Sequence, residues 1–227
     1  HLVVARRVFD NLTPGWQQIG AVWLPLPHLL TLVPTQIDAL YRTGIFASAL
    51  SIASFTLCAS ATARLVLAAT GSSIGATTAV MLLALNPNLL YLQATPMTEP
   101  LLIGLTALVV LWLFEWAQSD RDDVPARLGV ALAALAWTRY EGWAVVGSGL
   151  IAAVYASWRF GTPASVVMRR AVRLAVWPAA AVVVFLINSR ITVGAWFVSG
   201  GFYVPDPTYE AQPVRTLIGL WWGTHQL

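Results

Sequence analysis

Two apolar runs without a single charged residue flank a short polar connection in this chain. The first run covers residues 74–92 and the second covers residues 101–114. Each is close to the length that crosses a bilayer, because about 20 apolar residues span roughly 30 Å of hydrocarbon. The connection, residues 86–100, carries one carboxylate, Glu99. An acid in a connection between two membrane segments lies where membrane and water meet. It can therefore reach a lipid-borne molecule without being buried in hydrocarbon.

The composition extends this character to the whole chain. Of its 227 residues, 58% are hydrophobic and only 10% are charged, whereas a soluble domain is usually about 25% charged. So few charges cannot cover a surface that faces water. The sequence therefore predicts an all-α, polytopic transmembrane helical bundle.

The basic residues are all arginine, 13 in number, and no lysine occurs. Together with abundant Ala, Val and Leu, this is typical of a GC-rich bacterial coding sequence, and it favours a bacterial plasma membrane protein. The arginines are scattered through the polar segments and form no basic stripe of the kind that tracks phosphates, so nucleic-acid binding is not expected. The positive-inside rule accounts for them better.

The polar interruptions divide the chain into about six to seven membrane segments. Clear segments are expected at residues 44–63, 74–93, 100–117 and 174–189, and another begins in the last 14 residues. Residues 128–157 contain the polar hexapeptide 138–143, so they form either one long helix or a pair of short helices.

The arginine distribution predicts the orientation. Seven of the thirteen arginines fall in residues 64–73, 118–127 and 159–173, which should therefore be cytoplasmic. The last two of these segments share a side only if residues 128–157 cross twice or enter and return, which favours the pair of short helices. The outer side then receives residues 1–43, 86–99, 138–143 and 190–213.

The outer segment 1–43 begins with an amphipathic pattern. Leu2, Ala5, Val8, Phe9 and Leu12 share one helical face, which is typical of a helix lying in the interface plane. We expect residues 1–43 to form an outer loop with this interfacial helix, and residues 44–227 to form the helical bundle.

The outer side also gathers the residues that could carry chemistry. Its carboxylates and basic groups are Asp10, Asp38, Glu99, Glu141, Asp206, Glu210, Arg6, Arg7, Arg139, Arg190 and His28. A carboxylate there can act as a general base on a hydroxyl or bind a divalent ion. Arginines can hold a phosphate by paired hydrogen bonds, and aromatic faces suit sugar rings.

Simpler interpretations stay open for each of these residues. Glu99 can be a plain acid in the first turn of a helix that Pro100 begins. Arg139 and Glu141 can pair locally to cover a tight turn. A lone histidine such as His28 is more often a hydrogen-bonded structural residue than a ligand.

Several of these segments resemble the GT-C superfamily of glycosyltransferases, which includes protein O-mannosyltransferases and lipid A aminoarabinose transferases. Residues 5–10 followed by residues 20–28, Gly-Ala-Val-Trp-Leu-Pro-Leu-Pro-His, resemble the first outer loop of that superfamily. Residues 86–100 resemble its second outer loop, where a further acid precedes a helix, and this maps to Glu99. Residues 138–143, Thr-Arg-Tyr-Glu-Gly-Trp, resemble the turn that faces the same cavity.

The resemblance implies a single GT-C-like transmembrane domain over residues 1–227, truncated at both ends. The acid of the first outer loop would then lie upstream of His1, and this fragment alone would be inactive. The implied activity is transfer of a sugar from a polyprenyl-phosphate donor to a hydroxyl of a glycan, lipid or protein outside the membrane. Glu99 would be the catalytic acid or base, and Arg6, Arg7 and Arg139 would bind the donor phosphate. His28 and Glu141 would contact the sugar or the acceptor, and Tyr140 would also bind substrate.

A divalent metal ion stays open as a cofactor, because some members of the superfamily resemble metal-dependent enzymes and others do not; Glu99 would be its ligand. The rival hypothesis is a transporter or a lipid-carrier translocase without enzymatic activity. Transporters usually place ionisable groups near the bilayer midplane on broken helices. The charge-free runs 44–63, 74–92 and 101–114 favour the enzyme.

Overall fold

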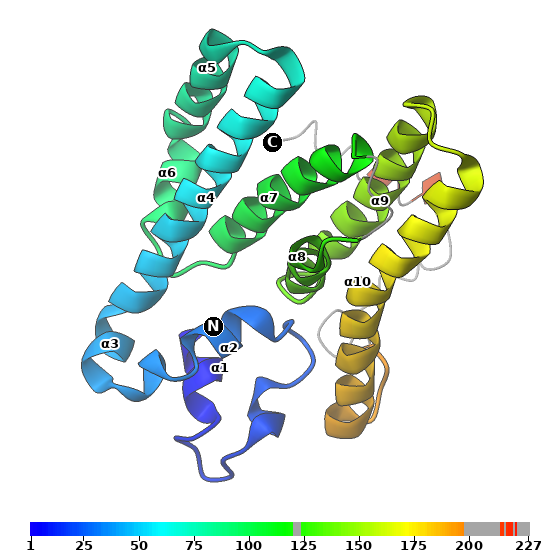
Figure 1. Cartoon of the computed structure of the whole chain (residues 1–227). Coiled ribbons are helices and arrows are strands. Elements are labelled where there is room, and N and C mark those ends of the chain that lie inside the picture. Colours follow the sequence, from blue (N-terminus) through cyan, green and yellow to red (C-terminus); the bar gives the residue numbers. More distant parts are fainter. Residues whose placement is uncertain (120–123, 198–213, 216, 220, 222–227) are drawn as a thin grey trace.

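The computed structural model describes residues 1–119, 124–197, 214–215, 217–219 and 221. Within these ranges the chain forms helices and no strand (Figure 1), which confirms the predicted all-α class. The helices are α1 (Leu2–Arg7), α2 (Leu26–Thr31), α3 (Asp38–Thr43), α4 (Ile45–Thr70), α5 (Ser73–Ala84), α6 (Pro87–Gln93), α7 (Glu99–Ala117), α8 (Ala126–Ala136), α9 (Glu141–Arg159) and α10 (Ala164–Val193), with short 3-10 turns at Trp16–Ile19 and Pro34–Gln36.

Helix α7 lies at the centre of the arrangement. It packs against α4 on one side and against α8 and α9 on the other, while α10 contacts α8 and α9 (Figure 1). Small buried residues such as Ser51 and Ser54 line the face of α4 that meets α7. Opposite them is Gly104, where a Cβ atom would come within 2.5 Å of the Ser54 carbonyl oxygen. The two backbones therefore touch, as is common where small residues meet between membrane helices.

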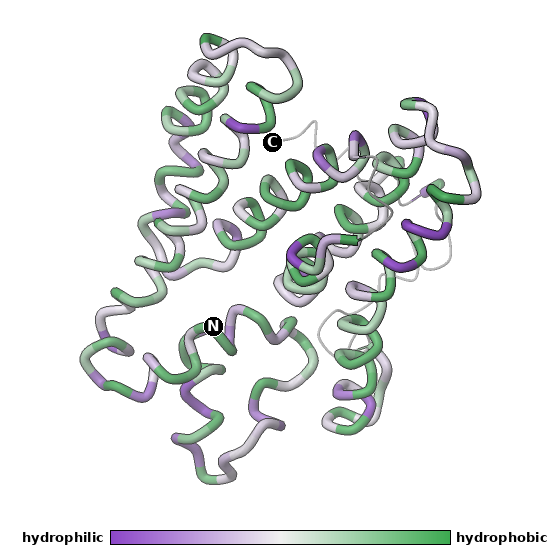
Figure 2. Tube along the Cα trace, in the orientation of Figure 1, coloured by the Kyte–Doolittle hydropathy of each residue, from purple (hydrophilic) through white to green (hydrophobic). Residues whose placement is uncertain are grey.

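Large apolar side chains fill the other side of α7. Val109, Leu113 and Trp116 pack with Leu132 of α8 and Leu174 of α10 in one buried cluster. Large apolar side chains are also exposed on several helices, for example Ile52 of α4, Ile151 of α9 and Val184 of α10, and hydrophobic residues recur along the helices in Figure 2. Apolar groups exposed on every side are what a protein surrounded by lipid needs.

Three helices of the described part are long and apolar enough to cross a membrane: α4, α7 and α10. A fourth span results if α5 and α6 are counted as one bent segment. The structure thus supports a membrane protein with three to four such spans. The larger predicted number of six to seven is not reached on this criterion, since α8 is only 11 residues long and α9 does not qualify.

Two predicted boundaries were wrong because helices run past them. Helix α4 continues beyond residue 63 to Thr70 and ends at Gly71, which adopts a left-handed conformation. Arg64 therefore lies on the helix and not in a loop. Helix α10 begins at Ala164, so most of the predicted polar loop 159–173 is helical.

The predicted span 74–93 is broken. Its two parts, α5 and α6, meet at an angle of 68°. Pro87 cannot continue the hydrogen bonding of α5 and starts a new helix. The side chain of Asn86 caps this helix by accepting hydrogen bonds from the backbone N–H groups of Asn88 and Leu89, at 3.0 and 3.2 Å.

The prediction of two helices within residues 128–157 is confirmed, since α8 and α9 are separate. The interfacial helix of residues 1–12 is shorter than expected, because α1 ends at Arg7. Its predicted apolar face divides accordingly. Ala5 is buried, whereas Phe9 and Leu12 are exposed. Asp206 and Glu210 lie outside the described residues, as does most of the last predicted segment.

Candidate functional site

Glu99 and Glu141 each stand at the first residue of a helix. Glu99 begins α7, where Pro100 favours the start of a helix because its N–H group is not needed there. Glu141 begins α9. A carboxylate in the first turn is favoured by the positive end of the helix dipole. The local sequence therefore places both acids at helix ends and outside the apolar interior.

Arg139 brings the two acids together from the turn between α8 and α9. Its Nη1 lies 2.8 Å from Oε1 of Glu99, and its Nη2 lies 2.9 Å from Oε1 of Glu141. Nη1 also donates to the hydroxyl of Thr98 at 3.0 Å. We call Thr98, Glu99, Arg139 and Glu141 the carboxylate cluster. Because both acids bind one guanidinium group, they lie at the same end of the molecule.

The electrostatics of the cluster follow from these contacts. The hydrogen bond from Arg139 lowers the pKa of Glu141. The pKa of Arg139 is raised, first by its hydrogen bond to Glu141 and further by the charge of Glu99. With two carboxylates and one guanidinium, the cluster carries a formal charge of −1. A further anion would therefore be repelled by the cluster as a whole.

One oxygen atom of the cluster is left over. Oε2 of Glu99 is buried and has no hydrogen-bond partner among the described residues. Thr98 also lines a small cavity of about 20 Å³, together with Pro27 and Thr31 of α2 and Ser51 of α4. The carboxylate of Glu99 thus keeps a free acceptor oxygen next to Thr98 in the chain.

Tyr140 connects the cluster to the N-terminal segment. Its hydroxyl donates to the carbonyl oxygen of Ala21 at 3.2 Å, and its ring meets Trp143 and Phe185 edge to face. Close by, the N–H group of Leu26 donates to the carbonyl oxygen of Trp137 at 3.0 Å. The loop that precedes α2 is therefore fixed to the turn between α8 and α9.

Further fixation comes from α10. The indole N–H of Trp16 donates to Oδ1 of Asn188 at 2.7 Å. Ala21 and Leu24 pack with Phe185 in a small apolar cluster. These contacts hold the predicted first outer loop over the ends of α8, α9 and α10.

His28 makes no hydrogen bond or ion pair with the residues of the carboxylate cluster. The side chain is fully buried in α2, and its ring centroid lies 5.2 Å from that of His1. Neither ring nitrogen has a hydrogen-bond partner among the described residues. Burial lowers the pKa of His28 to about 4, so the ring is neutral at pH 7.

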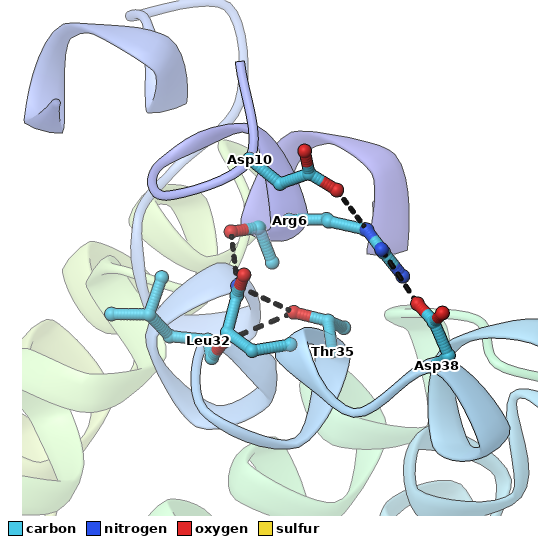
Figure 3. Close-up of polar contacts among 7 residues, drawn as sticks. Arg6, Asp10, Leu32, Thr35 and Asp38 are labelled. Atoms are coloured by element: carbon cyan, nitrogen blue, oxygen red, sulfur yellow. Dashed lines mark hydrogen bonds and ion pairs between the residues drawn. The ribbon is translucent and has the colours of Figure 1, made fainter. Parts of the chain in front are cut away.

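Arg6 is engaged with acids of the N-terminal segment. It pairs with Asp10 at 2.7 Å and with Asp38 at 2.6 Å (Figure 3), and its guanidinium lies 4.5 Å from the centre of the Tyr41 ring. The pKa of Asp38 is lowered by the hydrogen bond from Arg6. Arg7 is exposed and makes no ion pair with a described residue. The structure thus joins Glu99, Arg139 and Glu141, but gives Arg6, Arg7 and His28 other surroundings.

Sequence reasoning missed Thr98, which is buried and shares Arg139 with Glu99. The motif Thr98-Glu99-Pro100 offered a signal, because threonine often precedes the first turn of a helix. It also missed Asp10 and Asp38 as the partners of Arg6. Asp10 follows Arg6 by four residues, a spacing that favours ion pairs on a helix. No spacing indicates Asp38, which is 32 residues away across a turn-rich segment.

A metal site is not apparent in the described part of the chain, where no group of three or more His, Cys, Asp or Glu side chains is close enough to share an ion. Beside Glu99 the adjacent charge is the guanidinium of Arg139, which would repel a divalent cation. The described residues around Glu99 therefore do not fit a resident divalent ion.

Comparison of the chain with protein-family models, with curated proteins and with solved structures gave no match.

Proposed function

We propose that this chain belongs to an integral membrane glycosyltransferase of GT-C type. It would act at the outer face of a bacterial plasma membrane, within a bundle of six to seven membrane segments in which α8 and α9 count as short ones. The sugar would come from a polyprenyl-phosphate donor and pass to a hydroxyl of a glycan, lipid or protein. The observation that carries the proposal is the carboxylate cluster, which joins the ends of α7 and α9 and leaves Oε2 of Glu99 without a partner.

Sugar transfer from such a donor requires that the donor and the acceptor be positioned and that one general base accept a proton. The oxygen of the acceptor hydroxyl attacks the anomeric carbon, the bond from that carbon to the phosphate oxygen breaks, and polyprenyl phosphate leaves with the electron pair. The hydroxyl proton passes to the carboxylate of Glu99. Such general base catalysis contributes typically 10²- to 10⁴-fold in rate.

Arg139 then acts as a positioning residue for Glu99. Its charge is shared by two carboxylates, and a phosphate bound there would have to approach a cluster with a formal charge of −1. Arg6 is similarly shared by Asp10 and Asp38. Of the three arginines proposed to bind the donor phosphate, Arg6 and Arg139 are paired with carboxylates. Arg7 forms no ion pair with a described carboxylate. Tyr140, Glu141 and His28 remain proposed contacts of the sugar or the acceptor.

The alternative function is transport of a polar or lipid-linked solute. The break between α5 and α6 favours it, because transporters use discontinuous helices to build their binding sites. Against it stands the composition of the break, since residues 73–93 contain no charged side chain. An ion or charged substrate would find no opposite charge there.

The decisive experiment compares two carboxylates of α7 in the full-length protein. Membranes containing the wild type, Glu99→Gln or Glu115→Gln are supplied with polyprenyl-phosphate mannose or polyprenyl-phosphate aminoarabinose, and release of polyprenyl phosphate is measured. We expect Glu99→Gln to lower the rate at least 100-fold and Glu115→Gln, at the other end of the helix, to leave it within about threefold. Normal turnover by Glu99→Gln, or an equal loss in both variants, contradicts the assignment.

A further inference from the structure

A second polar site lies at the opposite end of α7. Glu115 is 16 residues beyond Glu99, which places it about 24 Å further along the helix axis. Here a cavity of about 110 Å³ opens between the last turns of α7 and the start of α8, lined by Trp112, Glu115, Trp116, Ser119 and Arg127. The cavity therefore has room for several water molecules or a group of similar size.

Among the described residues, the charged side chains around this cavity are mostly positive. Glu115 is bridged by Nη2 of Arg64 at 3.0 Å and by Nη2 of Arg127 at 3.4 Å, one arginine at each carboxylate oxygen. The guanidinium of Arg127 lies 5.2 Å from the centre of the Trp112 ring. Two cations and one anion leave a formal charge of +1. Both arginine side chains are 62% exposed, so they keep donors for a further acceptor.

A third cation lies behind the wall of the cavity. Arg170 of α10 is almost completely buried. It donates to the carbonyl oxygens of Trp116 and Ser119, each at 3.1 Å, and to the hydroxyl of Ser119 at 3.1 Å. Its guanidinium also lies 4.7 Å from the centre of the Trp116 ring. No described carboxylate pairs with it, so its charge adds to the positive potential at this end of α7.

Buried donors without acceptors mark the same place. Trp116 is 2% exposed and lines the cavity, yet its indole N–H has no acceptor among the described residues. The Nε–H group of Arg170 lacks one too. Leaving such groups unpaired costs free energy. An acceptor-rich group in the cavity would remove part of that cost.

We propose that this cavity binds a phosphate group, carried by an anionic lipid headgroup or free in solution. A phosphate brings acceptor oxygens and negative charge to Arg127 and to the indole N–H of Trp116. Tryptophans and arginines at helix ends are typical of the membrane interface, and basic pockets between membrane helices bind anionic headgroups. Asp120, Asp122 and Asp123 lie outside the described residues.

The test measures the thermal unfolding of the purified protein in a neutral detergent. Three probes are titrated at constant ionic strength: dihexanoyl phosphatidylglycerol, dihexanoyl phosphatidylcholine and inorganic phosphate. We expect phosphatidylglycerol or inorganic phosphate to raise the unfolding temperature saturably, and phosphatidylcholine to have little effect. Saturation by phosphatidylglycerol alone identifies a lipid headgroup, whereas an equal response to inorganic phosphate identifies a free phosphate.

Variants tie the response to the cavity. Arg127→Gln and Trp116→Phe, which keeps an aromatic ring but removes the N–H group, should each raise the concentration at half-saturation about tenfold. Arg159→Gln, at the exposed end of α9, serves as the control and should not change it. Normal saturation in both cavity variants, an equal loss in Arg159→Gln, or no response to either of the two probes with net negative charge would overturn the proposal.

Discussion

Nη1 of Arg139 lies 2.8 Å from Oε1 of Glu99, although 40 residues separate them in the chain. This ion pair joins the start of α7 to the turn between α8 and α9. It also fixes one oxygen of the Glu99 carboxylate and leaves the other, Oε2, without a partner among the described residues. The effect of the pair on stability and its proposed effect on activity can therefore be measured separately.

The first prediction concerns stability. In a double-mutant cycle with Arg139→Gln and Glu99→Gln, we expect a coupling energy of about 0.5–1 kcal/mol, because both side chains are partly exposed and solvent screens them. The double-mutant cycle of Arg139→Gln with Glu141→Gln should give a smaller coupling energy, because Glu141 is more exposed to solvent. The Glu141 side chain is 59% exposed, against 30% for Glu99. The free energy of unfolding in detergent provides the measurement, and a larger coupling to Glu141 would contradict the order.

The second prediction concerns pH and His28. Burial lowers the pKa of its folded-state imidazole to about 4 from an ordinary value of 6.5. Between these values the unfolded chain binds a proton that the folded chain excludes, so stability rises with pH. The contribution of His28 to the free energy of unfolding is fully present above pH 6.5 and is lost as the pH falls towards 4. The loss amounts to about 3 kcal/mol in total.

The control for this effect is His28→Phe, which fills the site with an apolar ring. This variant should lose most of the slope of unfolding free energy against pH between 6.5 and 4. Urea unfolding at several pH values provides the measurement. An unchanged slope in His28→Phe would show that other groups cause the dependence.

The third prediction concerns the contact between α4 and α7. A Cβ atom added at Gly104 would lie 2.5 Å from the Ser54 carbonyl oxygen, which is backbone and cannot rotate away. Gly104→Ala should therefore destabilise the fold by about 1–3 kcal/mol. Gly147→Ala in α9 is the matched control, since nothing lies within 4 Å of its added Cβ, and it should be neutral or stabilising by up to about 1 kcal/mol. Equal effects of the two substitutions would exclude close packing as the cause.

Sequence reasoning predicted those parts of the fold that follow from local composition. The apolar run around Leu101 and Val109 predicted α7 almost to its ends, and the polar segment around Arg139 predicted the break between α8 and α9. It failed at Arg64, because a single exposed arginine does not end a helix when its side chain can reach Glu115 of α7. It failed also at residues 74–93, where hydropathy alone does not register the break imposed by Pro87.

The sequence allows the residues of the candidate site to be predicted, but not the contacts between them. The polar segments between the apolar runs, together with the resemblance to GT-C enzymes, single out Glu99, Arg139 and Glu141. Their mutual contacts depend on the packing of α7 against α8 and α9, which no local pattern specifies. Arg6 illustrates the converse, since it was assigned to a phosphate but lies between Asp10 and Asp38, two acids brought to it by the turns after α1 and before α3.

The last prediction separates positioning by Arg139 from phosphate binding by it. If Arg139 positions Glu99, Arg139→Lys keeps the positive charge but cannot contact Thr98, Glu99 and Glu141 at once, because an ammonium group lacks the planar fork of a guanidinium. We then expect kcat for transfer to fall about tenfold while KM for the polyprenyl-phosphate donor changes little. If Arg139 instead binds the donor phosphate, KM should rise and kcat should be nearly retained. Arg7→Gln is the matched comparison, since the proposed function makes Arg7 the phosphate ligand, and it should raise KM for the donor about tenfold.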